Sequence, residues 1–410
     1  MPLEMTANDP LDQRRALIGT MILAVVISLA SSVLLHPTDT LWSTTIAALR
    51  GEFTFIDVVL IGTYITHVWS LDPQARQRSL LMCLVLEGGS QLLGGSTLGV
   101  FAGFLAIGER AYGASQASTR DERRRHLAIL VDGLAFPVFA LTSPSLLGTV
   151  ACLRADTFDA YLARIDNSFP VIPSVLCAQI YARFPHLETV SSFAYGALAP
   201  LFCVIYAESS RVAPNAPPTP LRAWMLAAIL GCLVYLLFPI VGPAQFFGGL
   251  PFPPNVLPEI SDAPTAVFPA LSLPRNGTPS LHTTWSLLAM MHARPLRLPF
   301  RIFGVALFLL TELATLGLGE HWLVDLIVAW PFAVGVDVLV RPGLRASRRA
   351  LLAGIAGLSV TLWLLVARYF HGALAHSYVA LLVLATLTAG LAFAIDQAAR
   401  VAEHQGNPST

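Results

Sequence analysis

The chain has 410 residues and zero formal net charge at neutral pH, and 55% of its residues are hydrophobic while only 12% are charged. Its mean hydropathy of +0.66 is far above that of a soluble globular protein of this size. This composition excludes an ordinary soluble enzyme. The absence of lysine and of any excess positive charge gives no reason to expect nucleic acid as a partner.

Several apolar windows of roughly 17–25 residues are long enough to cross a bilayer as helices. A backbone in lipid must satisfy its hydrogen bonds internally, so helices are the expected spanning form. We therefore predict an all-α, polytopic transmembrane helix bundle in a bacterial-type inner or plasma membrane. The five cysteines are scattered through apolar segments without paired spacing, which predicts neither a disulfide framework nor a zinc knuckle.

In the N-terminal half, residues 16–35 predict a retained first span rather than a cleaved signal peptide. Residues 36–52 resemble an outside loop, and residues 53–70 a weaker second span. The stretch 79–108 suits either one tilted helix or two short helices, and the arginines at both of its ends favour a hairpin. In the two-helix alternative, the breaks are expected at residues 87–91 and at Gly94-Gly95.

The arginine cluster in residues 120–126 predicts a cytoplasmic anchor for a span over residues 127–152, in which Pro137 and Pro144 are expected to introduce kinks. Residues 156–169 are polar at helical spacing. This pattern fits an interfacial helix, and it fits a solvated connector equally well.

The second half of the chain contains a series of further apolar segments joined by arginine-rich or proline-rich loops. A long loop, residues 242–279, delivers the chain to Ser280, and long ordered loops are often functional. From these boundaries we predict membrane helices of unknown role in residues 1–190, a catalytic core in 191–340, and two further helices with a cytoplasmic tail in 341–410. The segments predicted in this half are 191–207, 223–241, 280–294, 302–318, 321–340, 351–367 and 378–395.

Two polar motifs lie at the edges of these apolar runs, where polar side chains are costly unless they have a role. They are Pro279-Ser280-Leu281-His282 and Gly319-Glu320-His321-Trp322-Leu323-Val324-Asp325. The apolar segment that begins at each motif ends in an arginine-rich loop, so the loops and the motifs lie on opposite sides of the membrane. The positive-inside rule places the loops in the cytoplasm and the two motifs outside, facing the periplasm or the cell exterior.

The residue types in these motifs suit chemistry on a phosphate. His321 and Asp325 are four residues apart, which predicts that the carboxylate orients the imidazole as a nucleophile. His282 is a candidate for proton transfer to a leaving oxygen. Ser280 is expected at a helix N-cap, where hydroxyl and amide groups bind anions, and Arg275 is a planar donor suited to phosphate. A zinc site made of His282, His321 and Asp325 is the chemical alternative, but a histidine nucleophile explains the motifs more simply.

Residues from about 193 to 340 resemble the type 2 phosphatidic acid phosphatase superfamily, whose signatures are Pro-Ser-x-His and a later His-x-x-x-Asp. Pro279-Ser280-Leu281-His282 and His321-Trp322-Leu323-Val324-Asp325 more closely resemble its inositol phosphorylceramide synthase-like branch. The resemblance implies a six-helix core, metal-independent chemistry without a cofactor, and a phosphohistidine on His321. It further implies His282 as the acid, Asp325 as the orienting carboxylate and Ser280 as a phosphate-binding residue.

The sequence departs from the broader family at the position of its Ser-Arg pair, which here reads Ala314-Thr315. The synthase-like branch also tends to lack this pair. No arginine-rich first motif is recognisable, and Arg275 is a candidate substitute. The first 190 residues resemble nothing that we can name.

The sequence therefore predicts a membrane enzyme that attacks a lipid phosphate or phospholipid headgroup through His321 and passes the phospho-group to water or to a lipid hydroxyl. The alternative is a non-catalytic lipid-binding or transport protein on a degenerate scaffold. Two acidic residues within apolar runs have open roles. Glu312 either supports the site or pairs with an arginine, and Glu87 either lines a cavity or packs beside glycines.

Overall fold

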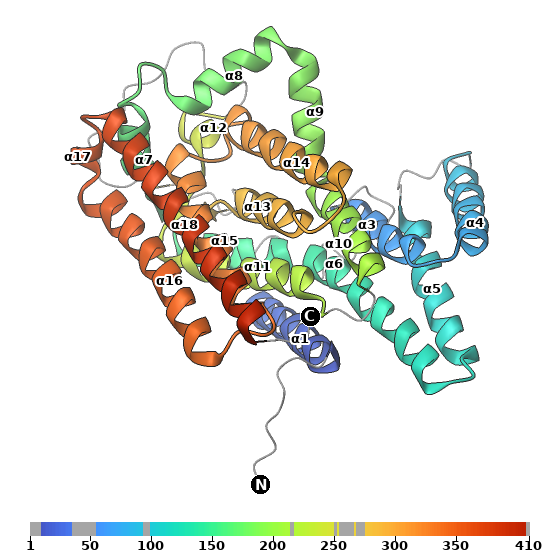
Figure 1. The fold of residues 1–410 in the computed structure, drawn as a ribbon. Coiled ribbons are helices and arrows are strands. Elements are labelled where there is room, and N and C mark those ends of the chain that lie inside the picture. The colour runs from blue at the N-terminus through green and yellow to red at the C-terminus, as the bar shows by residue number, and fades with distance from the viewer. Residues whose placement is uncertain are drawn as a thin grey trace. The chain divides into compact units, whose positions relative to one another are not determined.

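The computed structural model describes residues 10–34, 55–92, 99–213, 217–249, 252–253, 266–267 and 275–406. The predicted outer loop 36–52 and Gly94-Gly95 lie outside this range, and the loop 242–279 is described only in part. Within the described residues the chain is all-α, as predicted, with seventeen helices and two very small sheets (Figure 1).

The described chain divides into two compact units. The first contains residues 1–146, 197–225 and 291–304, and the second contains residues 147–196, 226–290 and 305–410. Each unit therefore draws on segments from distant parts of the chain.

The first unit contains the N-terminal helices. Within it, α3 packs against α4, α5 and α10, and α4 packs against α5. Its helices, some of which continue into residues of the second unit, are α1 (Pro10–Leu34), α3 (Phe55–Trp69), α4 (Pro73–Leu92), α5 (Val100–Gln116), α6 (Arg120–Leu153) and α10 (Leu198–Val212).

The second unit contains the remaining helices. These are α7 (Asp159–Asp166), α8 (Pro173–Arg183), α9 (Pro185–Gly196), α11 (Thr219–Leu237), α12 (Pro243–Phe246), α13 (Leu281–Ala293), α14 (Leu298–Gly317), α15 (Leu323–Val340), α16 (Ala346–Tyr369), α17 (His371–Leu374) and α18 (Tyr378–Gly406), of which α11, α13 and α14 also contribute residues to the first unit.

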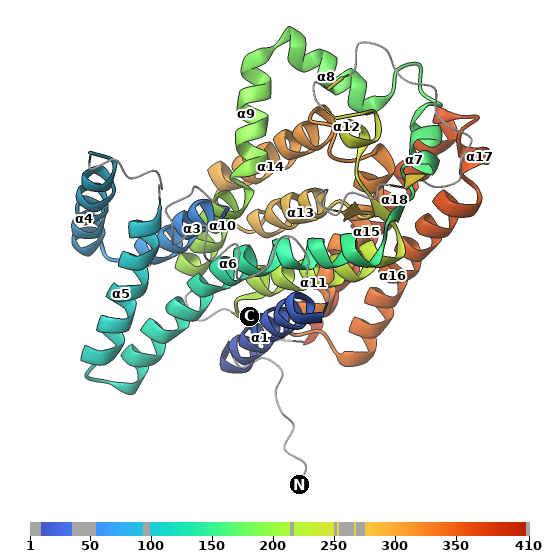
Figure 2. The same cartoon turned by 180° about the vertical axis from the view of Figure 1, so that it is seen from behind.

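Helix α15 is the central helix of the second unit, where it packs against α7, α16 and α18 (Figures 1 and 2). Its most apolar window is 83% buried, whereas those of α16 and α18 are 28% and 22% buried. Because lipid solvates apolar surface, the exposed faces of α16 and α18 fit a bilayer, and α15 forms the protein interior.

Six of the described helices are long and apolar enough to cross a membrane, and α9 with α10 adds a seventh if that pair forms one span. The chain is thus an integral membrane protein. The predicted spans from residue 302 onward match α14, α15, α16 and α18 closely. The six helices are α6, α11, α14, α15, α16 and α18.

Four predicted spans look different in the structure, and the one over residues 191–207 is divided between α9 and α10. Helix α1 covers the predicted first span but is not among the six, and the apolar part of α3 is the shorter run Val59–Trp69. Helix α13 has 13 residues. At 1.5 Å per residue it covers about 20 Å, which is less than the roughly 30 Å of a hydrocarbon core.

Two local predictions in the N-terminal half need correction. The break expected at residues 87–91 is wrong, because α4 continues to Leu92; the Glu87 carboxylate instead accepts the backbone amides of Gly99 and Ala102 at the start of α5. Residues 156–169 are not a surface element. Asp159 and Asp166 of α7 are fully buried, where they accept hydrogen bonds from the second polar motif itself and from the backbone amide of Val241.

Both small sheets lie in the second unit. Strand β1 (Asp156–Thr157) pairs antiparallel with β3 (Ala266–Val267), and β2 (Pro239–Ile240) pairs antiparallel with β4 (Asn276–Gly277). The second pairing joins the end of α11 to the residues just before Ser280. This pairing therefore fixes the backbone just before the first polar motif, where the long loop ends.

Candidate active site

Asp325 is the centre of the hydrogen-bond network at the two motifs. Its side chain accepts the Thr278 hydroxyl and the backbone amide of Trp322 at 2.9 Å, and it faces His321 Nδ1 at 3.3 Å. Its backbone carbonyl accepts the amide of Ser280 at 3.1 Å. A single fully buried residue therefore joins the two motifs, which are about forty positions apart in the chain.

His321 lies just before α15 and not within it, so the predicted helical i to i+4 spacing is not the reason for its contact with Asp325. Trp322 is the N-cap, and Asp325 is the third residue of the helix. From there its carboxylate turns back to the helix start, as acidic residues at this position do. The outcome is the predicted pair, in which Nδ1 faces the carboxylate and Nε2 is the nitrogen left for a substrate.

Ser280 caps α13. Its Oγ accepts the backbone amide of Thr283 at 3.3 Å, and its carbonyl accepts the amide of Thr284 at 3.0 Å. The N-cap position expected from the sequence is thus present, and the first amides of α13 have no partner within their own helix. A helix start of this kind attracts anions.

His282 is the second residue of α13, two positions after Ser280, whose backbone amide donates to the carbonyl of Asp325. The ring stacks on Tyr195 of α9 with 3.8 Å between ring centroids and 17° between planes, and it meets Trp285 edge-on. Aromatic contacts on two sides fix the ring orientation. The structure therefore brings both histidines into one site.

Glu312 of α14 binds side chains of α13. Its carboxylate accepts the Thr283 hydroxyl at 3.0 Å and the Ser286 hydroxyl at 3.3 Å. Of the two roles that the sequence left open, the structure supports the first, since these partners are hydroxyls of the helix that carries His282.

Arg275 is fully buried, and its guanidinium donates to the carbonyls of Arg154 and Ala155 at 3.2 and 3.5 Å. Burial lowers the pKa of this arginine, while the nearby carboxylates of Asp159 and Asp156 act in the opposite direction. Thus the structure brings His282, His321, Asp325 and Ser280 together, and it holds Arg275 at the end of α6.

Two buried carboxylates that the sequence did not single out as site residues hold the second motif in place. Asp159 accepts the indole N–H of Trp322 at 2.8 Å, and Asp166 accepts the amide of Leu323 at 3.1 Å. Burial raises the pKa of Asp159 to about 6 and that of Asp166 to about 8. The polar spacing of residues 156–169 was visible in the sequence, but their burial was not.

Glu320, next to His321, was also missed. Burial raises the pKa of its carboxyl, while His321 and the Asn276 side chain act in the opposite direction. Within the part of the chain that the structure describes, no group of three or more His, Cys, Asp or Glu side chains is arranged to hold a metal ion, and all five cysteines are free thiols.

One known family matches the part of the chain that contains the two motifs. Residues 160–339 match the family model of the PAP2 superfamily. The match begins well before residue 191, where the catalytic core was predicted to start, and it includes most of α7. It covers both polar motifs. No curated protein and no solved structure gives a significant match to the chain.

Proposed function

We propose that the chain is a membrane phosphatase or phosphotransferase that acts on a lipid phosphate or a phospholipid headgroup through a phosphohistidine on His321. The observation that carries this proposal is the arrangement around Asp325, which holds the nucleophile candidate and the capped start of α13 in one network. The PAP2 match over the same residues supports it.

In the first step, Nε2 of His321 attacks phosphorus, a P–N bond forms, and the P–O bond to the leaving group breaks. Asp325 stabilises the positive charge that develops on the imidazole. His282 gives a proton to the departing oxygen. In the second step, water or a lipid hydroxyl attacks phosphorus, His282 takes the proton of the attacking group, and the P–N bond breaks. Splitting one displacement into two is the advantage of covalent catalysis.

The equatorial phosphate oxygens need compensating charge, and the family's Ser-Arg pair is replaced here by Ala314-Thr315. We assign this role to Ser280 and the amides at the start of α13, because preorganised donors at a helix N-terminus stabilise anionic transition states. Arg275 contributes only if substrate binding releases it from the carbonyls of Arg154 and Ala155. The missing pair also favours the synthase-like branch, in which the acceptor is a lipid hydroxyl.

The test uses the purified full chain in detergent with phosphatidic acid and phosphatidylinositol that carry radioactive phosphate. We expect release or transfer of label by the wild type and a loss of at least about 10³-fold in His321→Ala, since removing a nucleophile leaves only binding effects. His376→Ala, which changes an exposed histidine between α17 and α18, serves as the matched control and should retain activity. Label trapped on the wild-type protein should be stable to alkali and labile to acid.

Activity that survives in His321→Ala contradicts the nucleophile assignment. Loss of activity with EDTA and recovery with zinc favours the metal alternative instead. If every substrate remains intact with the wild type while lipid still binds, the non-catalytic alternative holds. Comparing labelled water-soluble phosphate with labelled lipid product separates hydrolysis from transfer.

A further inference from the structure

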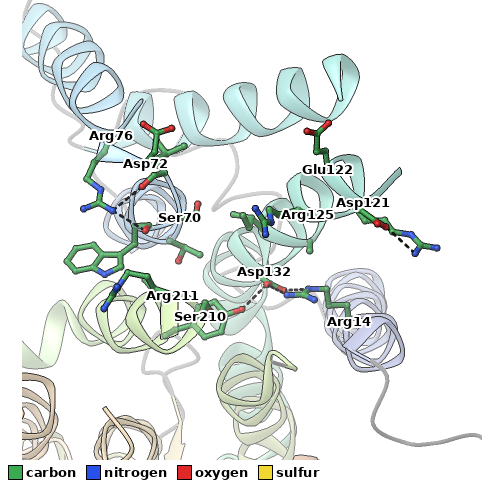
Figure 3. A pocket seen from close by; sticks show the side chains of 18 of the residues that line it. Arg14, Ser70, Asp72, Arg76, Asp121, Glu122, Arg125, Asp132, Ser210 and Arg211 are labelled. Carbon is green, nitrogen blue, oxygen red and sulfur yellow. Dashed lines mark hydrogen bonds and ion pairs between the residues drawn. The ribbon is translucent and has the colours of Figure 1, made fainter. Parts of the chain in front are cut away.

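A large cavity lies wholly within the first unit and shares no residue with the candidate active site. It has a volume of about 800 Å³ and is lined by α1, α3, α6 and α10 with the start of α4 (Figure 3). Small-molecule sites in proteins have volumes of this order. The proposed function assigns nothing to these helices, so the cavity needs its own explanation.

The lining is unusually rich in arginine. Five arginines and four carboxylates leave one positive charge in excess, and Figure 3 shows guanidinium groups arranged around the opening. The charged lining residues are Arg14, Arg76, Arg124, Arg125, Arg211, Asp72, Asp121, Glu122 and Asp132.

Most of the negative charge is already paired within the protein. Asp132 accepts Arg14 Nη2 at 2.9 Å and the Tyr206 hydroxyl at 2.8 Å. Asp72 and Glu122 accept backbone amides beside the starts of α4 and α6. These carboxylates are therefore poor partners for a cationic ligand.

Four of the five lining arginines also have partners among the described residues, and Arg125 is the exception. Arg125 is exposed and makes no hydrogen bond or ion pair with any residue that the structure describes. Glu208 is shared by Arg211 at 2.7 Å and Arg297 at 2.9 Å, and it also accepts the Trp69 indole N–H. Two guanidinium groups on one carboxylate leave a net positive charge beside the cavity.

The ends of the apolar helices place this cavity at the level of the membrane at which lipid headgroups lie. Arg14 precedes the apolar run of α1, Arg125 precedes that of α6, and Arg211 lies in the last turn of α10. Arginines at the ends of apolar helices mark the membrane–water boundary. Beyond Arg14, α1 exposes Ile22 and Val26 at 57% and 53%. The acyl chains of a lipid bound at this opening can therefore contact the exposed apolar side chains of α1.

We propose that this cavity binds the phosphodiester headgroup of a membrane phospholipid, with the Arg125 guanidinium as the main donor to the phosphate. A phosphodiester carries one negative charge, which matches the single positive charge in excess, and guanidinium is suited to bidentate phosphate binding. Under the positive-inside rule this is the cytoplasmic leaflet. The site is independent of the catalytic proposal and would hold whether or not His321 is a nucleophile.

The test measures binding of a short-chain phosphatidylglycerol to the delipidated full chain in detergent by calorimetry, with native mass spectrometry to count bound lipids. We expect Arg125→Gln to weaken binding at least about tenfold, the effect of losing one charge-assisted hydrogen bond. Arg125→Lys keeps the positive charge but loses the planar bidentate donor, so its affinity for the lipid should lie between those of the wild type and Arg125→Gln. Arg123→Gln is the matched control, because this exposed arginine is two residues away on α6 and does not line the cavity.

Two further arms identify the ligand and the site. Inorganic phosphate should bind far more weakly than the lipid, and the effect of Arg125→Gln on lipid binding should persist in a Ser280→Ala background, because Ser280 belongs to the other unit. Equal weakening by Arg125→Gln and Arg123→Gln would mean general surface electrostatics and would overturn the proposal. Tight binding of inorganic phosphate would overturn the assignment of the ligand as a lipid. Unchanged lipid binding in Arg125→Gln would contradict the role of Arg125 as the main donor to the phosphate.

Discussion

The fully buried side chain of Asp325 organises the candidate active site by accepting three donors at once. Such a carboxylate has two separable effects: its acceptor geometry holds the two motifs, and its negative charge stabilises the positive charge that would develop on the imidazole of His321 during attack on phosphorus. An asparagine amide keeps one acceptor oxygen for the Trp322 amide and can donate its NH2 to the Thr278 hydroxyl, so the first effect is largely retained, but the negative charge is lost.

Asp325→Asn should therefore lower kcat by about 10³–10⁴-fold, as expected when an orienting carboxylate becomes an amide. Folding should be retained. Thr278→Val removes one donor to Asp325 and leaves the histidine pair, so its loss of kcat should be much smaller. Steady-state kinetics on phosphatidic acid, with thermal unfolding of each variant as a check, measure both. Equal kcat in wild type and Asp325→Asn would contradict the orienting role.

Asp166 makes the stability of the chain depend on pH, because burial raises the pKa of its carboxyl to about 8. Between about pH 4 and 8 the folded chain retains a proton that the unfolded chain has released, so stability falls as pH rises through this window. Asp159, with a pKa of about 6, adds to the decline only up to about pH 6.

In Asp166→Asn the decline between pH 6 and 8 should become shallower than in the wild type, and the thermal unfolding midpoint in detergent should be higher than that of the wild type at pH 8. Asp156→Asn is the control. Arg154 lowers the pKa of that carboxyl, so its contribution to stability is lost only in acid and leaves the pH 6–8 curve unchanged. Parallel curves for wild type and Asp166→Asn would show that Asp166 is ionised in the folded chain.

Among the elements, the long helices were predictable and their ends were less so. Apolar windows are local in sequence, so α14, α15, α16 and α18 lie where hydropathy places them. The pairing of His321 with Asp325 was predicted from helical i to i+4 spacing, but His321 precedes α15. The contact forms because Asp325, the third residue of α15, turns back to the helix start, and this depends on where α15 begins. Arg275 has the chemistry of a phosphate donor, but its carbonyl partners come from residues 154 and 155, which no local pattern connects to it.

The short helix α12 fixes the backbone beside the second motif. Its N-cap, Gly242, has φ of 84°, and a Cβ there would lie against the carbonyl of Glu320, next to His321. A side chain at this position meets both a left-handed backbone and a fixed peptide, which costs about 1–3 kcal/mol.

Gly242→Ala should consequently lower the thermal unfolding midpoint and also reduce kcat, since relief of the clash displaces the peptide that carries His321. Gly354→Ala in α16 is the matched control, because no neighbouring group lies within 4 Å of the position that an alanine Cβ would take there, and helix propensity predicts a neutral or slightly stabilising effect. Unchanged midpoint and kcat in Gly242→Ala would show that the loop accommodates a side chain without cost.

For the whole molecule, orientation in the membrane is the property that decides which side the substrate comes from. The positive-inside rule predicts that Arg345, between α15 and α16, is cytoplasmic, and that the turn containing His376, between α17 and α18, is outside with the two motifs. Both side chains are exposed.

In a cysteine-free background, a membrane-impermeant maleimide should label His376→Cys in intact cells and should label Arg345→Cys only after lysis. Gel shift of the tagged chain measures both. The reverse pattern would place the candidate active site in the cytoplasm.

The interleaving of the two units has a consequence for biosynthesis. The first unit needs residues 291–304, and the second needs segments on either side of them. A ribosome must therefore synthesise about three quarters of the polypeptide before either unit has all its parts, and early helices wait in the bilayer without their final neighbours. Nascent chains arrested before that point should be strong substrates for membrane quality-control proteases.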